Sequence, residues 1–207
     1  MLKRLFALSL GLAGLALPSV GNVAPTFADE KDGSSKTLVI DVSMDGVGTW
    51  SSTKGDISHF LENKRGDTFI VRGSIYPGGT IPEGDGVFGP DEPGRIGTWL
   101  CRGTFNFDLV PDIVNLGAVP HVTTTQTYVL PDSFSPAQEL ISATTMESDG
   151  FEGGVPTRRV LLGGTGNCKG AQGEVLQRTL GMSKGGLFNH RFTFKFGELP
   201  STCRLRH

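Results

Sequence analysis

Cysteine and histidine are scarce in this sequence, and their scarcity removes several kinds of chemistry. The 207 residues include 3 cysteines and 4 histidines, without a Cys-x-x-Cys pair or a His/Cys spacing typical of a zinc site. A Gly-x-Ser-x-Gly elbow is also absent, so nucleophilic hydrolysis has no support. We therefore expect no metal site and no cofactor.

Long hydrophobic runs are absent except at the start of the chain. Leu5–Leu17 is apolar, follows Lys3 and Arg4, and has the length of a signal-peptide core rather than of a bilayer span. Small residues and prolines come next, and we place the cleavage site after Ala28. The alternative, a buried helix, leaves the two charges and the proline-rich exit unexplained. We expect residues 1–28 to be a secretory signal peptide and the protein to be secreted or periplasmic, with no membrane span.

An excess of basic residues is missing too. Removing residues 1–28 takes Lys3 and Arg4 from the 19 basic residues and leaves 17 against 21 acidic ones, a net charge of −4. A basic face is the expected footprint of nucleic-acid binding, so this composition argues against a nucleic-acid partner. After a flexible segment at 29–36, residues 37–207 suit one domain with its own core.

Helical periodicity is rare in this domain, whereas strand patterns recur between glycine, proline, aspartate and asparagine residues. The predicted strands are Lys36–Met44, Thr68–Tyr76, Ile96–Phe107, His121–Leu130, Glu139–Met146, Thr157–Leu162, Ala171–Leu180 and Leu187–Phe196. Eight short strands favour an all-β fold, either a closed antiparallel barrel or a sandwich. Such a barrel has no open edges and holds packed side chains or one small ligand. One short helix is predicted near Ile57–Asn63.

Two of these strands alternate clearly between an apolar and a polar face. In the last strand, one face carries Phe188, His190, Phe192, Phe194 and Phe196. In the strand at Ile96–Phe107, one face carries Trp99, Cys101, Gly103, Phe105 and Phe107. A period of two predicts that these faces are buried. On such a face, a hydrogen-bonded core histidine is the favoured interpretation of His190 over a ligand-binding one.

The segment from Tyr76 to Gly94 is dense in glycine, proline and acidic residues. We predict a long mobile loop there. Loops of this length are often lids or binding loops and are otherwise disordered, and both interpretations stay open.

The stretch Val160–Gln177, "VLLGGTGNCKGAQGEVLQ", has the glycine content of a phosphate-binding loop but not its spacing. Counted from Gly163 or from Gly164, the second required glycine falls on Cys168 or Lys169. A strand pattern follows instead of a helix, so no helix N-terminus is present to hold an anion. We predict a glycine-rich hairpin turn.

Four charged residues interrupt otherwise strand-like runs: Asp41, Arg72, Arg102 and Glu174. On the outer face of a barrel they are solvated, which is the simpler interpretation. If they point inward they must pair, because an unpaired buried charge is too costly. An inward, paired carboxylate is also able to bind or polarise a ligand.

The glycine turn with its flanking strands resembles allene oxide cyclases and plant dirigent proteins, both small eight-stranded antiparallel barrels. "RIGTWLCRGTF", Arg95 to Phe105, is similar to a strand of the cyclases, and "GDTFIVRGSIYPGG" fits more loosely. The resemblance covers Thr37 to Phe196. It implies that this all-β domain is an eight-stranded antiparallel barrel with an apolar interior that binds a small molecule. In the cyclases, a carboxylate and an ordered water also assist ring closure.

Carried over by position, the glutamate of the cyclases falls on Asp41 and their pocket cysteine on Cys101. Two asparagines of the family fall on Ser43 and near Gly73, so both amides are lost. Literal allene oxide cyclase activity is therefore not expected.

The first strand raises a conflict, because its apolar face and Asp41 lie on opposite sides. That face consists of Leu38, Ile40, Val42 and Met44. If it is the interior, Asp41 points outward and the carry-over fails. If Asp41 points inward, the apolar face needs a cover, which the homotrimers typical of the family would supply.

Two hypotheses of different classes follow, with a structural module that binds nothing as a third. In the first, an interior with Trp99 and Phe105 binds and orients an apolar small molecule, as dirigent proteins do. In the second, an isomerase or cyclase uses Asp41, with Arg72 or Arg102 as an anchor for an anionic head group. The predicted ligand-binding residues are Ser43, Arg72, Trp99, Cys101, Arg102 and Phe105.

Export favours one disulfide and leaves one thiol over. In an up-and-down barrel, the turn that contains Cys168 lies at the same end as the exit of the last strand, which Cys203 follows. We predict a Cys168–Cys203 disulfide, with Cys101 as the remaining thiol.

Overall fold

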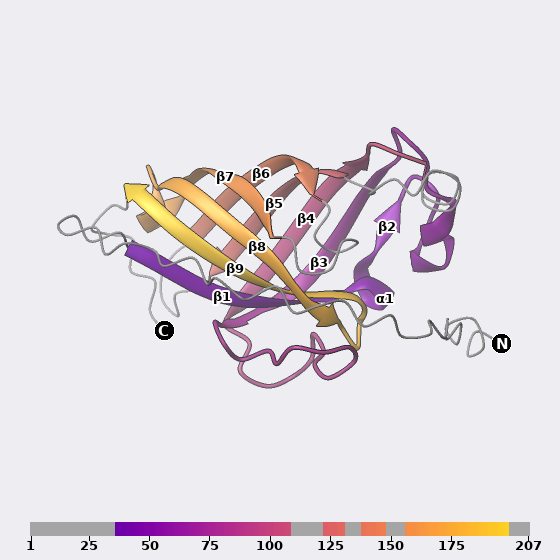
Figure 1. Cartoon of the computed structure of the whole chain (residues 1–207), viewed down its shortest axis with the longest axis horizontal. Coiled ribbons are helices and arrows are strands. Elements are labelled where there is room, and N and C mark those ends of the chain that lie inside the picture. The colour runs from indigo at the N-terminus through magenta and orange to yellow at the C-terminus, as the bar shows by residue number, and fades with distance from the viewer. Residues whose placement is uncertain (1–35, 109–121, 131–137, 148–155, 199–207) are drawn as a thin grey trace, which may run out of the picture. The chain divides into compact units, whose positions relative to one another are not determined.

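The computed structural model describes residues 36–108, 122–130, 138–147 and 156–198, which belong to one compact unit (Figure 1). The elements in chain order are β1 (Lys36–Asp45), α1 (Gly46–Thr49), β2 (Ser51–Ser52), η1 (Ile57–Glu62), β3 (Thr68–Pro77), β4 (Gly97–Phe105), β5 (Val122–Leu130), β6 (Gln138–Glu147), β7 (Thr157–Gly164), η2 (Gly166–Cys168), β8 (Gln172–Met182) and β9 (Gly186–Glu198). Within these ranges, no helix has the length and apolar character needed to cross a membrane.

The strands form a closed antiparallel barrel. Their order is β1-β9-β8-β7-β6-β5-β4-β3, and β1 also pairs with β3, which closes the sheet on itself. The eight-stranded barrel is thus confirmed, and each predicted strand has its counterpart. β2 is an additional two-residue strand on β3, and the predicted short helix is the 3₁₀ helix η1.

The alternating strands bury the faces that their sequences predict. Trp99, Cys101 and Phe105 of β4 belong to the core, as do Phe192 and Phe194 of β9. His190 is buried on the same face, and its Nδ1 lies 3.2 Å from Thr179 Oγ1, as expected of a hydrogen-bonded core histidine. The two strands therefore line the interior of the barrel with aromatic rings.

β1 adopts the first of its two predicted arrangements. Leu38, Ile40, Val42 and Met44 pack into the core, so Asp41 lies on the opposite, outer side of the barrel wall. Asp41 is nevertheless buried, since other parts of the same chain cover it.

The cover is the segment 78–94, which we call the strap. It runs along the outside of the barrel, where Tyr76, Ile81 and Leu180 form a small second core against Phe88. The Tyr76 hydroxyl donates to the carbonyl oxygens of Pro90 and Glu92, at 2.8 and 3.0 Å. The segment predicted as a mobile loop is therefore tied down by apolar packing and hydrogen bonds.

The glycine-rich stretch forms the predicted hairpin turn. β7 ends at Gly164, η2 makes one short turn, and β8 returns antiparallel to β7. A Cβ on Gly164 would lie 2.6 Å from the carbonyl oxygen of Cys168 and 2.8 Å from that of Glu139. The glycine is required there because two backbone segments approach it closely.

Candidate functional site: an aromatic cavity above a buried carboxylate

The interior of the barrel contains a small, partly open cavity of about 50 Å³. Its walls are almost entirely apolar. The lining residues are Met44, Trp50, Phe60, Phe69, Trp99, Cys101, Phe105, Val122, Glu147, Leu187, Phe188 and His190. Glu147 and His190 stand out in this set because they bring ionisable groups to an aromatic wall.

One wall of the cavity is formed by the segment that joins β1 to β3 and by the start of β3. Trp50 follows α1, and Phe60 lies on η1. The Trp50 ring stacks on Phe69, with centroids 4.8 Å apart and planes 13° from parallel. Phe60 meets the same indole edge to face at 5.1 Å. Three aromatic rings therefore pack together in this wall of the cavity.

A buried ion pair forms the polar floor beside this cavity. Arg159 Nη1 donates to Glu147 Oε2 at 2.6 Å, with 0% of the Arg159 side chain and 13% of the Glu147 side chain exposed. Thr124 Oγ1 donates to the same carboxylate oxygen. Gln177 Nε2 donates to Glu147 Oε1 at 2.6 Å. The carboxylate is thus held from three strands, β5, β7 and β8.

Further polar side chains continue the cluster away from the cavity. Gln126 donates to Gln177 Oε1 at 3.0 Å and accepts from the Tyr128 hydroxyl at 2.6 Å. Burial is the largest single effect on the pKa of Arg159 and lowers it, but the charge and hydrogen bond of Glu147, together with Tyr128 and Cys101, outweigh burial, and the pKa is raised overall. Burial raises the pKa of Tyr128 above its ordinary range. At neutral pH the cluster therefore contains a guanidinium ion and a neutral phenol.

The arrangement can accept a hydrogen bond from a ligand or stabilise positive charge that develops on it. A carboxylate has about four acceptor sites. Glu147 Oε1 receives one hydrogen bond, from Gln177. Glu147 lines the cavity, an apolar space where electrostatic interactions are stronger than in water. Within the described ranges, no group of metal-ligating side chains could hold an ion.

Three of the six predicted ligand-binding residues line the cavity: Trp99, Cys101 and Phe105. The other three lie elsewhere. Ser43 is on the outer side of β1, where its hydroxyl lies 2.9 Å from that of Ser183. Arg72 and Arg102 are exposed on the outer face, as in the simpler interpretation of the mid-strand charges.

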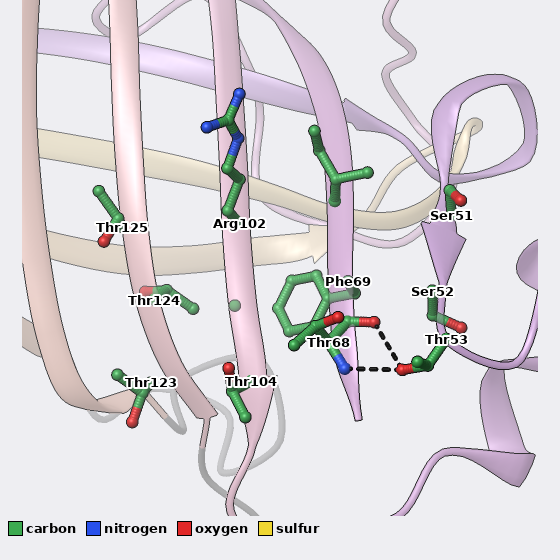
Figure 2. A pocket seen from close by; sticks show the side chains of 12 residues that line it. Ser51, Ser52, Thr53, Thr68, Phe69, Arg102, Thr104, Thr123, Thr124 and Thr125 are labelled. Carbon is green, nitrogen blue, oxygen red and sulfur yellow. Dashed lines mark hydrogen bonds between the residues drawn. The ribbon is translucent and has the colours of Figure 1, made fainter. Parts of the chain in front are cut away.

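Arg102 belongs to a wide, open groove on that outer face (Figure 2). Threonine and serine side chains from β2, β3, β4 and β5 surround it, and Thr68 and Thr53 are hydrogen-bonded to each other at its edge. The groove is separate from the interior cavity, so Arg102 is not placed to anchor the head group of an interior ligand.

Asp41, the predicted catalytic residue, is fully buried in an ion pair outside the barrel interior. Its carboxylate accepts from Arg191 Nε at 2.8 Å and from Arg191 Nη2 at 3.0 Å. It also accepts from the backbone amides of Gly79 and Ile81, both at 2.9 Å. The hydrogen bond from Arg191 raises the pKa of that guanidinium. The geometry shows Asp41 fastening the strap to β1 and β9.

Of the predicted cysteine arrangement, the structure describes two members. Cys101 is a buried thiol on the cavity wall, outside any disulfide. Cys168 is buried at the end of η2. Cys203 lies outside the described residues, so the Cys168–Cys203 disulfide stays a prediction.

The sequence interpretation did not identify Glu147 or Arg159. On β6, Leu140 and Ser142 are buried, and strict alternation would turn Glu147 outward. A register shift between the pairs Val122–Glu147 and Thr124–Thr144 reverses that direction. Such bulges re-aim side chains and are common beside active sites. On β7, "TRRVLLGG" has apolar residues on both faces, so no pattern marked Arg159 as inward.

The sequence matches no protein-family model and no curated protein. Its fold does match solved structures. The pterocarpan synthase dirigent protein GePTS1 is similar over 85% of this chain and 98% of its own, with 11% identity and a TM-score of 0.54. The chain has a dirigent-like barrel.

Two further solved structures are similar to this chain. The pterocarpan synthase dirigent protein PsPTS1 is similar over 78% of this chain and 93% of its own, with 12% identity and a TM-score of 0.54. A pyocyanin demethylase is similar over 78% of this chain and 99% of its own, with 16% identity and a TM-score of 0.47. At these identities the likeness concerns the fold alone.

Proposed function

We propose that this dirigent-like barrel binds a flat, largely apolar small molecule in its interior and orients it above Glu147. One observation carries the proposal. The cavity has walls of aromatic rings and a single carboxylate held by hydrogen bonds. Apolar pockets with a few fixed polar groups are the usual form of small-molecule sites.

The size of the cavity implies that the mouth opens on binding. Its volume is about 50 Å³, whereas a cavity of about 150 Å³ in another protein accommodates benzene. η1 is the element suited to move, because it has no buried residue and Leu61 on it is 63% exposed. An outward shift of η1 withdraws the Phe60 ring and enlarges the mouth.

The proposal is tested by filling the cavity. Cys101→Phe adds a ring to the cavity wall, whereas Leu100→Phe adds the same ring type to the outer face of the same strand. We expect Cys101→Phe to weaken the binding of aromatic probes such as toluene and phenol by at least about tenfold, and Leu100→Phe to leave it unchanged. Calorimetric titration measures the affinity, and circular dichroism confirms folding. Equal affinity in both variants would place the site outside the barrel.

Glu147 favours a second candidate function, an isomerase or cyclase that uses this carboxylate for proton transfer or charge stabilisation. A base in a dry cavity beside an oriented ligand contributes through positioning and proton transfer. The test is exchange of the α-hydrogens of a cavity-bound aromatic ketone, β-tetralone, in D₂O, followed by NMR. The carboxylate removes a proton from carbon, and a solvent deuteron returns to the same carbon.

The matched variants for this test are Glu147→Gln and Asp41→Asn. We expect the first to abolish protein-dependent exchange and the second to preserve it, since Asp41 lies outside the interior. The reverse result would restore the catalytic role that the sequence predicted for Asp41. Exchange that no variant changes would leave binding and orientation as the function.

Export and assembly complete the proposal. We infer that residues 1–28 are removed on export, that Cys168 and Cys203 form a disulfide, and that the mature protein is a homotrimer. Val160 and Leu162 support assembly, because they are 60% and 59% exposed on the outer side of β7. Native mass spectrometry of the exported protein measures all three properties and any co-purified ligand. A full-length, reduced monomer would contradict each of them.

A further inference from the structure

Trp50 leaves a buried hydrogen-bond donor without a partner beside the cavity. The side chain is 7% exposed and lines the cavity, and its Nε1 has no hydrogen-bond acceptor. Two other buried side-chain atoms in the described ranges share this condition, Asn63 Oδ1 and Asn189 Oδ1. Trp50 is the only one of the three residues that lines this cavity.

The other tryptophan that lines the cavity, Trp99, has a hydrogen-bond acceptor for its indole N–H. Trp99 Nε1 donates to Gln126 Oε1 at 3.3 Å, within the polar cluster. Buried tryptophan N–H groups usually find such a partner, and an unmet one costs stability. The Trp50 donor is therefore buried in the cavity wall at an energetic cost, which an acceptor on a ligand would remove.

We propose that Trp50 is a ligand-binding residue and that the polar end of the ligand both accepts and donates a hydrogen bond. It accepts from Trp50 Nε1 and donates to the Glu147 carboxylate, the two groups that line the same cavity. A hydroxyl group or a primary amide on a flat apolar body has this capacity. This inference rests on the proposed interior binding function and specifies the chemistry of its ligand.

The same two residues favour such a group over other head groups. A carboxylate or phosphate is repelled by Glu147, and the only cation of the cluster, Arg159, is already engaged by Glu147, Thr124 and Ser142. An ammonium group has no acceptor for the Trp50 donor. An ether accepts from Trp50 but offers nothing to Glu147. The site is thereby selective for a neutral group with both capacities.

Three probes of similar size separate these contacts: phenol accepts and donates, anisole only accepts, and toluene does neither. We expect wild-type protein to bind phenol about tenfold more tightly than toluene, with anisole between them. Trp50→Phe keeps a ring against Phe69 but removes the donor. It is expected to weaken the binding of phenol and anisole about fivefold and to leave the affinity for toluene unchanged. Glu147→Gln is expected to weaken the binding of phenol and to leave the affinities for anisole and toluene unchanged.

Calorimetric titration of the folded proteins gives each affinity, and the pattern across probes separates a hydrogen bond from packing. An equal loss for all three probes in Trp50→Phe would show that Trp50 only packs, and it would overturn the inference while interior binding stands. Retention of the full phenol preference in Trp50→Phe would overturn it as well. Failure of wild-type protein to bind any probe would reject the proposed function itself, and this inference with it.

Discussion

Arg159 and Glu147 form an ion pair inside the barrel, with Arg159 Nη1 2.6 Å from Glu147 Oε2. The pair joins β6 to β7 and separates the aromatic cavity from the remaining polar cluster. Because desolvated charges are stable only with partners, each member fixes the other in place. The stability of the barrel and the chemistry of its cavity therefore depend on the same contact.

Removing one member of the Arg159–Glu147 ion pair should strongly destabilise the folded protein. In Arg159→Met the Glu147 carboxylate stays in the interior without its counter-ion, and we expect the free energy of unfolding to fall by about 3–5 kcal/mol. Adding Glu147→Leu should recover a large part of that loss, because the uncompensated charge is then removed. Chemical denaturation measures both.

The neighbouring residue supplies the matched control. Arg158 forms a 2.7 Å ion pair with Glu174 on the outer surface, where its side chain is 71% exposed. Arg158→Met should change the free energy of unfolding by less than about 1 kcal/mol. Similar losses for Arg158→Met and Arg159→Met would contradict the interior placement of Arg159.

Asp41→Asn should weaken the strap without affecting the cavity. The substitution removes the charge that pairs with Arg191 while it keeps one side-chain oxygen for the backbone amides of the strap. We expect a loss of about 1–3 kcal/mol in the free energy of unfolding. Hydrogen exchange should show faster opening of residues 78–94, while the affinity for phenol stays the same. A changed affinity with intact strap protection would link Asp41 to the ligand site.

Tyr128→Phe should alter the dependence of stability on alkaline pH. Burial raises the pKa of Tyr128 in the folded protein above the ordinary value of 10.0. Below about pH 10 the phenol is protonated in both states, so its contribution is fully present. Above that pH the unfolded chain loses the proton and the native state keeps it. The free energy of unfolding then falls with rising pH, by about 1.4 kcal/mol per pH unit.

Tyr128→Phe lacks this fall in the free energy of unfolding at alkaline pH. It should be less stable than wild type by about 1 kcal/mol at pH 8, because hydrogen bonds of the hydroxyl are lost. The difference should shrink between pH 10 and 11.5, as measured by urea denaturation. Parallel stability curves for the two proteins would show that Tyr128 ionises as easily in the folded state as in the unfolded one.

Gly164→Ala tests the close approach within the glycine turn. The added methyl group would meet two backbone oxygens at 2.6 and 2.8 Å, which cannot rotate away. We expect a loss of about 1–3 kcal/mol in the free energy of unfolding. Gly197→Ala is the control, because a Cβ there has nothing within 4 Å and should cost less than about 0.5 kcal/mol. Equal, small effects would mean that the turn relaxes freely.

The regular part of the fold could be predicted because it follows from local patterns. A period of two on β4 and β9 identified the buried rings, and Trp99, Cys101 and Phe105 were placed on the cavity side for that reason. The failed phosphate-loop spacing after Val160 correctly predicted a hairpin. These inferences need only the direction of alternate side chains along one strand.

The site itself could not be predicted because it depends on irregularities and on distant pairs. A register shift turns Glu147 inward, and Arg159 is 12 residues away on a strand without clear alternation. The family resemblance implied that Asp41 is an interior carboxylate, while the strand pattern left its direction open; Arg191, 150 residues later, and the strap pair with it outside the barrel.

The sequence by itself determined the strands and the buried faces of β4 and β9, because alternation and turn chemistry are local and each strand carries its own signal. Only the tertiary structure decided which carboxylate faces the interior. That choice depends on one bulge, on the segment that covers the outer wall and on partners from other strands, and no single stretch of the chain records those relationships.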